Sequence, residues 1–253
     1  MRRLFSALAF LSIIPVPERW KRGETNAMFA AYPAAGLLLG VMLAGAALAA
    51  SLVLPPMLLA VFCIGLNILL TGAIHLDGLA DCADAFYGRR DRARVLEILK
   101  DPRIGTMGGA AIGLSLLARF ACFSTMPRAA LLVGIAGGAA LARTAVPVAM
   151  RLLPYVRIRG GILPGSASVS GLVTAGAAVC AALFFVLLPV PTAAAAAALA
   201  CFWKLSWRKL GGCTGDVLGA SIEIAELAFV TALAAEAAAG RVLGLLGALV
   251  AGA

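Results

Sequence analysis

The sequence predicts an all-α protein that crosses a membrane repeatedly, with about 6–8 transmembrane or membrane-embedded helices. Of its 253 residues, 62% are hydrophobic and only 13% are charged, and the mean hydropathy is +1.01. An ordinary soluble domain is about half apolar and about a quarter charged. Several apolar runs also reach the roughly 20 residues that cross a bilayer. We therefore expect a single membrane-embedded domain over residues 1–253.

The apolar runs define the expected helices in order along the chain. Residues 4–14 predict an interfacial or buried helix, and residues 91–100 a short amphipathic one. The run 191–203 is short for a span, so we expect it to be half-buried. The candidate spans are residues 32–54, 57–76, 106–124, 129–150, 169–189, 191–203 and 217–239, with a further apolar tail to residue 253.

The basic residues indicate how the chain is threaded through the membrane. With the N-terminus inside, the inside segments hold 17 Lys and Arg residues and the outside turns hold only Arg128. Cytoplasmic loops are enriched in Lys and Arg. We therefore predict a multi-pass membrane protein whose N-terminus and 77–105 segment are cytoplasmic. The net charge of +9 comes from clusters between apolar runs, which favours anionic lipid headgroups over nucleic acid as partners.

Five of the six aspartates lie between residues 77 and 101. Asp77, Asp81 and Asp84 have the spacing i, i+4, i+7, which places them on one face of a helix. Like charges on one face repel each other and are costlier near lipid. A divalent cation would relieve both problems, and carboxylates without thiols favour Mg²⁺, Mn²⁺ or Ca²⁺. These residues predict a metal site, with a solvated acidic face as the alternative.

A basic, glycine-containing loop follows this acidic cluster. Lys100 and Arg103 precede Gly105 and Gly108. Arginine binds phosphate through paired hydrogen bonds, and glycine allows close approach of the backbone. We expect these four residues to bind substrate phosphate; the alternative is a flexible entry to the next span.

A second acidic pair lies near the C-terminal end. Asp216 and Glu223 are seven residues apart and share a helical face, with Thr214 as a candidate N-cap. The threading places this segment on the same membrane side as Asp77. We expect Asp216 to join the metal ligands, and Thr214 and Glu223 to contact substrate.

Three further polar residues stand out. His75 is the only histidine; on a continuous helix it points away from Asp77, so it is either a structural residue or a general base. Arg143 lies inside an apolar span and should face a carboxylate or a substrate phosphate. Arg119 could instead extend its charged end to the interface.

Several segments resemble the cobalamin synthase family, also called adenosylcobinamide-GDP ribazoletransferases. They occur in the family's order and together extend over nearly the whole chain. The segments are residues 5–17 (FSALAFLSIIPVP), 71–84 (TGAIHLDGLADCAD), 96–108 (LEILKDPRIGTMG) and 211–220 (GGCTGDVLGA).

The resemblance implies a Mg²⁺-dependent transferase of the inner membrane, acting late in vitamin B12 biosynthesis. It would join adenosylcobinamide-GDP and α-ribazole, or α-ribazole 5′-phosphate, to give adenosylcobalamin, or its 5′-phosphate, and GMP. Asp77, Asp81 and Asp84, with Asp216, would bind Mg²⁺, and Arg103 would contact the diphosphate. Asp84 or His75 would accept the hydroxyl proton. A homo-oligomer is compatible with this interpretation.

Two other functions share some of these features. A CDP-alcohol phosphotransferase is also a Mg²⁺-dependent membrane enzyme, but its motif begins D-x-x-D-G-x-x-A-R. Here Ile74 stands three residues before Asp77, and Ala80 is followed by Asp81. A cation-coupled transporter would place its site near the midplane with repeat symmetry, whereas these acids cluster at one face.

Overall fold

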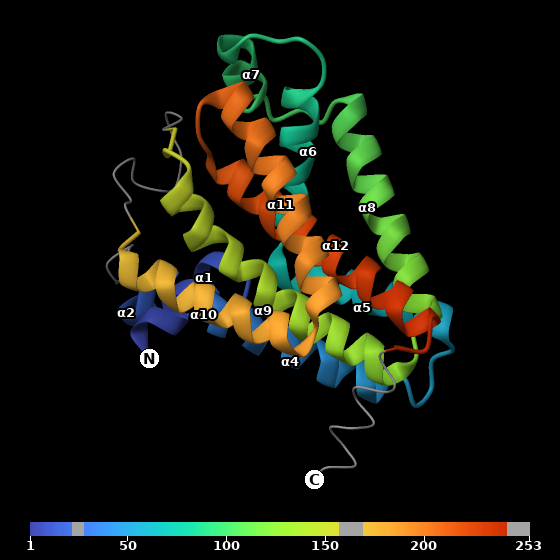
Figure 1. Cartoon of the computed structure of the whole chain (residues 1–253). Coiled ribbons are helices and arrows are strands. Elements are labelled where there is room, and N and C mark those ends of the chain that lie inside the picture. The colour runs from blue at the N-terminus through green and yellow to red at the C-terminus, as the bar shows by residue number, and fades with distance from the viewer. Residues whose placement is uncertain (22–27, 157–168, 242–253) are drawn as a thin grey trace.

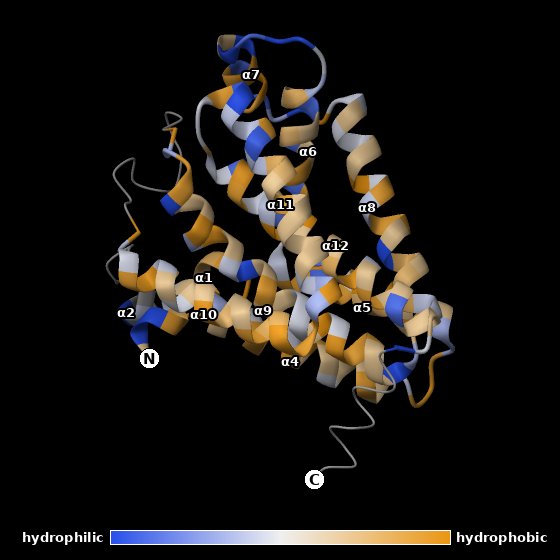
Figure 2. Ribbon diagram, viewed as in Figure 1, coloured by the Kyte–Doolittle hydropathy of each residue, from blue (hydrophilic) through white to orange (hydrophobic). Residues whose placement is uncertain are grey.

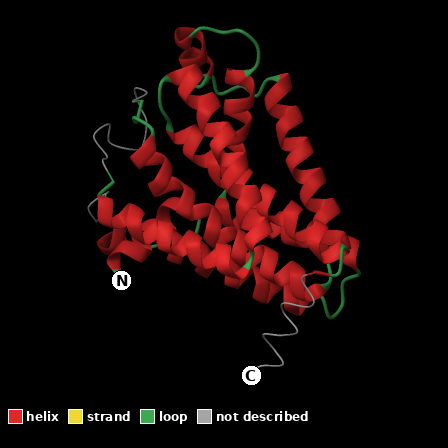
Figure 3. Ribbon diagram, viewed as in Figure 1, coloured by secondary structure: helices red, strands yellow, loops and turns green. Residues whose placement is uncertain are grey.

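The computed structural model describes residues 1–21, 28–156 and 169–241. Helices account for most of this part of the chain, and no β-strand is present in it (Figure 3). An isolated bridge joins Tyr155 to Cys213. The helices are α1 (Arg2–Leu11), α2 (Glu18–Lys21), α4 (Tyr32–Ala50), α5 (Pro56–Thr71), α6 (Ile74–Phe86), α7 (Arg92–Ile98), α8 (Thr106–Thr125), α9 (Arg128–Leu152), α10 (Gly171–Leu187), α11 (Pro189–Leu210) and α12 (Gly215–Ala238).

The lengths and hydropathy of these helices confirm a polytopic α-helical membrane protein. Among the described residues, α4, α8, α9 and α12 are each long and apolar enough to cross a bilayer. The pair α5–α6 passes the same test as one broken span, and α10 is a shorter apolar helix. Many large apolar side chains on α4, α5, α8 and α10 face outward, as expected where lipid is the solvent.

The candidate span 57–76 is interrupted. Helix α5 ends at Thr71, and α6 begins at Ile74 at an angle of 89° to it. Gly72 and Ala73 between them both have left-handed backbones, with φ of 62° and 59°. A hydropathy pattern cannot show this break because both halves are apolar. Its consequence is that the aspartate motif lies on a helix that turns away from the span before it.

Helix α11 also differs from expectation. The run 191–203 predicts a short, half-buried segment, but the helix extends from Pro189 to Leu210. Lys204, Arg208 and Lys209 occupy its last two turns. Cations are favourable at the C-terminal end of a helix, so the helix continues past the apolar run. Three of the 17 basic residues in the predicted inside segments, Arg22, Arg157 and Arg159, lie outside the described residues, as does the apolar tail 242–253.

Helix α9 is the centre of the molecule. Its most apolar window is 78% buried, against 33% for α4 and 28% for α8. It packs against α4, α10 and α12, and α12 also packs against α6, α8 and α11. In Figure 1, α6, α8 and α11 run toward the end that carries α7. Hydrophilic residues gather at that end (Figure 2), which places the acidic segment beside the polar end of the bundle.

Candidate active site

Close packing between α6 and α12 brings the two acidic motifs together. A Cβ added at Gly78 would lie 2.7 Å from the carbonyl oxygen of Asp216, and one at Gly219 would lie 3.3 Å from that of Ile74. The two backbones are therefore nearly in contact. Only glycine permits this approach, and it places the turns that hold Asp77 and Asp81 beside the start of α12.

The carboxylates of this region form one electrostatic group. The charges of Asp77, Asp84 and Asp216 all act on Asp81. Asp77 is exposed, and the other three aspartates are partly buried. All four share the oxygen chemistry that a hard divalent cation prefers. However, in the described part of the chain no three His, Cys, Asp or Glu side chains are arranged to hold a metal ion. The four carboxylates are therefore close in space, but their side chains do not form a complete set of metal ligands.

Asp84 already has two partners. Its Oδ2 accepts a hydrogen bond from the backbone N–H of Gly105 (2.7 Å), and its Oδ1 accepts one from that of Gly108 (2.9 Å). Both N–H groups lie at the start of α8, where a helix favours negative charge. A Cβ at Gly105 or Gly108 would lie 2.5 or 2.3 Å from an Asp84 oxygen. The sequence predicts that these glycines leave room for a substrate phosphate. In the structure that room is occupied by the Asp84 carboxylate.

Arg103 lies in the exposed loop that follows α7. Its Nε and one terminal nitrogen donate to the two Asp101 oxygens, at 2.8 and 2.6 Å. This pairing lowers the pKa of Asp101 to about 2. The Arg103 side chain is still 85% exposed, so its remaining donors are open to solvent. Lys100, just before this pair, is also exposed.

Thr214 caps α12. Its hydroxyl oxygen accepts a hydrogen bond from the N–H of Val217 (3.4 Å), and the hydroxyl lies 3.2 Å from an Asp216 oxygen. The residue is almost fully buried. Its predicted capping role is confirmed. Thr214 thereby fixes the backbone at the start of α12, next to Asp216.

A buried network of four charges joins α8, α9 and α12. Arg119 of α8 bridges Glu223 (2.8 Å) and Glu226 (3.1 Å) of α12. Arg143 of α9 pairs with the second oxygen of Glu226, and Ser115 donates to Glu223 (2.8 Å). Two arginines and two glutamates balance each other, which reduces the cost of burying them.

This network settles where Arg119, Arg143 and Glu223 lie. Arg143 faces a carboxylate, which is the first of the two partners expected for it. Arg119 is buried and does not extend to the interface. Glu223, predicted to contact substrate, is engaged by Arg119 and Ser115. Sequence reasoning missed Glu226 and Ser115 as partners. The available signal was Glu226 itself, a second carboxylate one turn beyond Glu223 inside an apolar helix.

His75 faces this network. Its side chain is 5% exposed and lines a cavity with Asn67, Thr71, Arg119 and Glu223. Its Nε2 has no hydrogen-bond partner within the described residues. Its neighbour two residues on, Asp77, is exposed, in line with the opposite directions that helical geometry gives these positions.

Comparison with known proteins connects this arrangement to one family. The family model described as cobalamin-5-phosphate synthase matches residues 3–234. An adenosylcobinamide-GDP ribazoletransferase from Chlorobium phaeobacteroides (strain BS1) is 38% identical over 90% of this chain and 95% of its own. Those named likewise from Citrobacter koseri and Klebsiella pneumoniae are 38% and 39% identical, each over 92% of this chain and 100% and 99% of their own. No solved structure matches the chain.

Proposed function

The chain belongs to the cobalamin-5-phosphate synthase family, and from that premise we infer that it acts in cobalamin biosynthesis as an adenosylcobinamide-GDP ribazoletransferase. The observation that carries this inference is the full-length match. Relatives with that name align over nine-tenths of this chain and nearly all of their own. The grouped carboxylates of α6 and α12 lie within the matched residues 3–234, whereas neither alternative function considered above has such support.

We propose that the reaction is a phosphoryl transfer. A free ribose hydroxyl of α-ribazole, or of its 5′-phosphate, attacks the phosphorus on the cobinamide side of adenosylcobinamide-GDP. In the 5′-phosphate this is the 2′- or 3′-hydroxyl, because the 5′ oxygen already carries phosphate. The new bond joins the ribose oxygen to that phosphorus. The bond from that phosphorus to the bridging oxygen breaks, and GMP leaves with the bridging oxygen. The hydroxyl loses its proton in the process. Such reactions depend mainly on positioning and on neutralising the phosphate oxygens.

Mg²⁺ fits the donor chemistry of this site. We propose that Asp77, Asp81 and Asp216 hold it, because they come from two helices in near contact and offer oxygen ligands only. When bound, Mg²⁺ would neutralise charge on the non-bridging phosphate oxygens. Asp84 is a weaker candidate ligand than the sequence suggests, because both its oxygens accept N–H donors from α8. The same two hydrogen bonds engage both carboxylate oxygens, so we also propose that Asp84 is less available as the proton acceptor.

The basic side chains of the α7–α8 loop supply the proposed diphosphate contacts. Arg103 is held by Asp101 and keeps exposed donors two residues before Gly105, whose N–H binds Asp84. Lys100 and the start of α8 are nearby in the chain. We propose that Arg103 orients the diphosphate, since an arginine fork matches phosphate geometry. Arg143 and Glu223 belong to the buried network and Thr214 caps α12, so we propose that these three residues support the helices.

We also propose that the site faces the cytoplasm across a bacterial inner membrane. The segment 77–105 and the last turns of α11 hold most of the exposed cations, and the positive-inside rule then orients the bundle. Nucleotide substrates and Mg²⁺ would reach the acidic residues from that side.

The first test is an assay of purified membranes with adenosylcobinamide-GDP and α-ribazole 5′-phosphate. We expect GMP and a corrinoid phosphate product, both dependent on Mg²⁺. Absence of any corrinoid product from correctly folded protein would overturn the proposed function.

Asp81→Asn tests the metal proposal separately. Removal of one carboxylate charge should lower activity at least about 100-fold at ordinary Mg²⁺ concentrations, the upper end of the effect known for residues around metal sites. Ser124→Ala is the matched control, because Ser124 is an α8 residue bonded only to its own helix. Full Mg²⁺-dependent GMP release by Asp81→Asn would show that the assignment of this ligand is wrong.

A further inference from the structure

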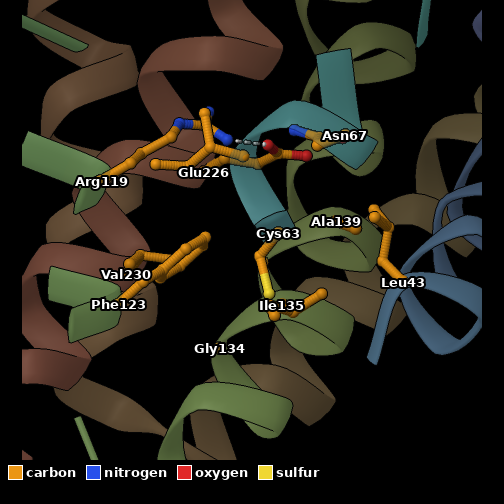
Figure 4. A pocket seen from close by; sticks show the side chains of 12 residues that line it. Leu43, Cys63, Asn67, Arg119, Phe123, Gly134, Ile135, Ala139, Glu226 and Val230 are labelled. Atoms are coloured by element: carbon orange, nitrogen blue, oxygen red, sulfur yellow. Dashed lines mark ion pairs between the residues drawn. The ribbon is translucent and has the colours of Figure 1, made fainter. Parts of the chain in front are cut away.

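Two small cavities flank Arg119 inside the membrane-embedded bundle. The first has a volume of about 10 Å³ and is lined by Asn67, Thr71, His75, Arg119 and Glu223, with apolar residues of α5, α6 and α8. The second has a volume of about 30 Å³. Figure 4 shows Arg119, Glu226 and Asn67 at one end of it, with Cys63, Phe123, Ile135 and Val230 around the rest. A water molecule needs about 10–15 Å³ in the same measure, so these spaces hold one and about two waters.

Two buried nitrogen atoms on residues that line these spaces have no hydrogen-bond partner in the described chain. They are Nε of Arg119 and Nε2 of His75, both on side chains more than nine-tenths buried. An unpaired buried donor or acceptor costs free energy, and in lipid there is no bulk water to compensate. Thr71 does not meet this need, because its hydroxyl donates to the Asn67 carbonyl within α5.

The charges around the cavities determine what can enter them. Arg119 and Arg143 are balanced by Glu223 and Glu226. An added ion would leave the group with a net charge in a medium of low dielectric constant, which is strongly disfavoured. The cavity volumes exclude anything larger than water. A neutral molecule that both donates and accepts hydrogen bonds is what remains.

We propose that these cavities bind ordered water inside the membrane, and that this water links His75 to Arg119. His75 begins the first turn of α6, just after the 89° break. The link therefore holds the start of α6 against α8 and α12, and with it the direction in which Asp77 and Asp81 point. His75 and Arg119 are positioning residues in this scheme and touch no substrate. This second part rests on the proposed function; the bound water does not.

Radiolytic footprinting of the detergent-free protein in lipid nanodiscs tests the water directly. Hydroxyl radicals formed from bound water label side chains next to it. We expect labelling of Leu116, which lines the first cavity, and little labelling of Leu114 and Leu117. Those neighbours on α8 are 68% and 65% exposed on the lipid-facing surface. Equal labelling of the three leucines, or none at Leu116, would overturn the proposal whether or not the protein is active.

Two variants test the positioning role. His75→Gln keeps a hydrogen-bonding side chain, and His75→Phe removes it and fills the cavity. We expect His75→Phe to lose the Leu116 label and to raise the Mg²⁺ concentration for half-maximal activity about 10-fold, as for other groups that orient metal ligands. His75→Gln should keep the Leu116 label. Its Mg²⁺ concentration for half-maximal activity should stay within about threefold of that of the original protein, well below the roughly 10-fold rise expected for His75→Phe. If His75→Gln abolished turnover while keeping the label and the thermal stability of the original protein, His75 would be the general base and the positioning role would be wrong.

Discussion

At the scale of single residues, Asp84 shows how a residue that looks catalytic can first be structural. It belongs to a three-aspartate face, yet its oxygens accept the N–H groups of Gly105 and Gly108. Gly105 and Gly108 lie 21 and 24 residues after Asp84 in the sequence, so these hydrogen bonds join α6 to the start of α8. A pattern of aspartates cannot reveal this, because the partners are backbone groups that every residue but proline has.

This role for Asp84 predicts a loss of stability in Asp84→Ala. Removing an acceptor at a helix N-terminus costs about 1–2 kcal/mol, so the midpoint of thermal unfolding in detergent should fall measurably. Asp84→Asn, which keeps one acceptor oxygen, should lose less. Asp91→Ala is a useful reference, since Asp91 caps the exposed helix α7 through Arg94 and should affect only that helix. An Asp84→Ala protein as stable as the original would contradict the capping role.

The pair of Asp101 and Arg103 predicts a specific pH behaviour. Because Arg103 lowers the Asp101 pKa to about 2, against an ordinary value near 4, the pair is fully formed above about pH 4. It is lost only as the pH falls through about 2. Asp101→Asn should therefore change kcat/KM by the same factor at every pH from 5 to 8. A factor that varied with pH in this window would mean that Asp101 titrates there and that the pairing is weaker than the geometry indicates.

At the scale of helices, the sequence predicts the existence of the elements better than their directions. The runs 106–124, 129–150 and 217–239 correspond closely to α8, α9 and α12. The run 57–76 does not, because the left-handed residues Gly72 and Ala73 turn the chain without changing its hydropathy. A glycine alone is a weak signal, and an alanine with positive φ gives none.

The packing of α4 on α9 leads to a test with an internal control. A Cβ at Gly36 would lie 2.5 Å from the Ala139 carbonyl oxygen and 2.9 Å from the Arg143 side chain. Gly36→Ala should therefore separate the helices and cost about 1–3 kcal/mol. Gly45→Ala, in the same helix, meets no atom within 4 Å and should be neutral or slightly stabilising, because alanine favours helix. Thermal unfolding of both variants in detergent measures the difference, and equal stabilities would contradict the close packing.

At the scale of the whole molecule, the polar end of the bundle could be predicted from the positions of the charged residues, whereas the partners of buried charges could not. The cluster of basic residues between Arg89 and Arg103 corresponds to the polar end that Figure 2 shows around α7. Pairing Arg119 with Glu223 and Glu226 requires knowing that α8 and α12 face each other. Sequence separations of about 100 residues carry no such information. The candidate site has the same limit: its aspartates share a face by spacing, but Asp216 joins them only through the contact of Gly78 with α12.

The proposed orientation of the bundle can be tested on intact membranes. In a variant whose six cysteines are replaced, Arg92→Cys places a thiol on exposed α7, and Arg128→Cys places one at the exposed α8–α9 turn. If α7 and the acidic site are cytoplasmic, a membrane-impermeant maleimide should label Arg128→Cys in spheroplasts and Arg92→Cys only in inverted vesicles. Both thiols should react in detergent, which controls for accessibility. The reverse pattern would place the active site on the outer face, away from cytoplasmic nucleotides, and would contradict the charge-based orientation.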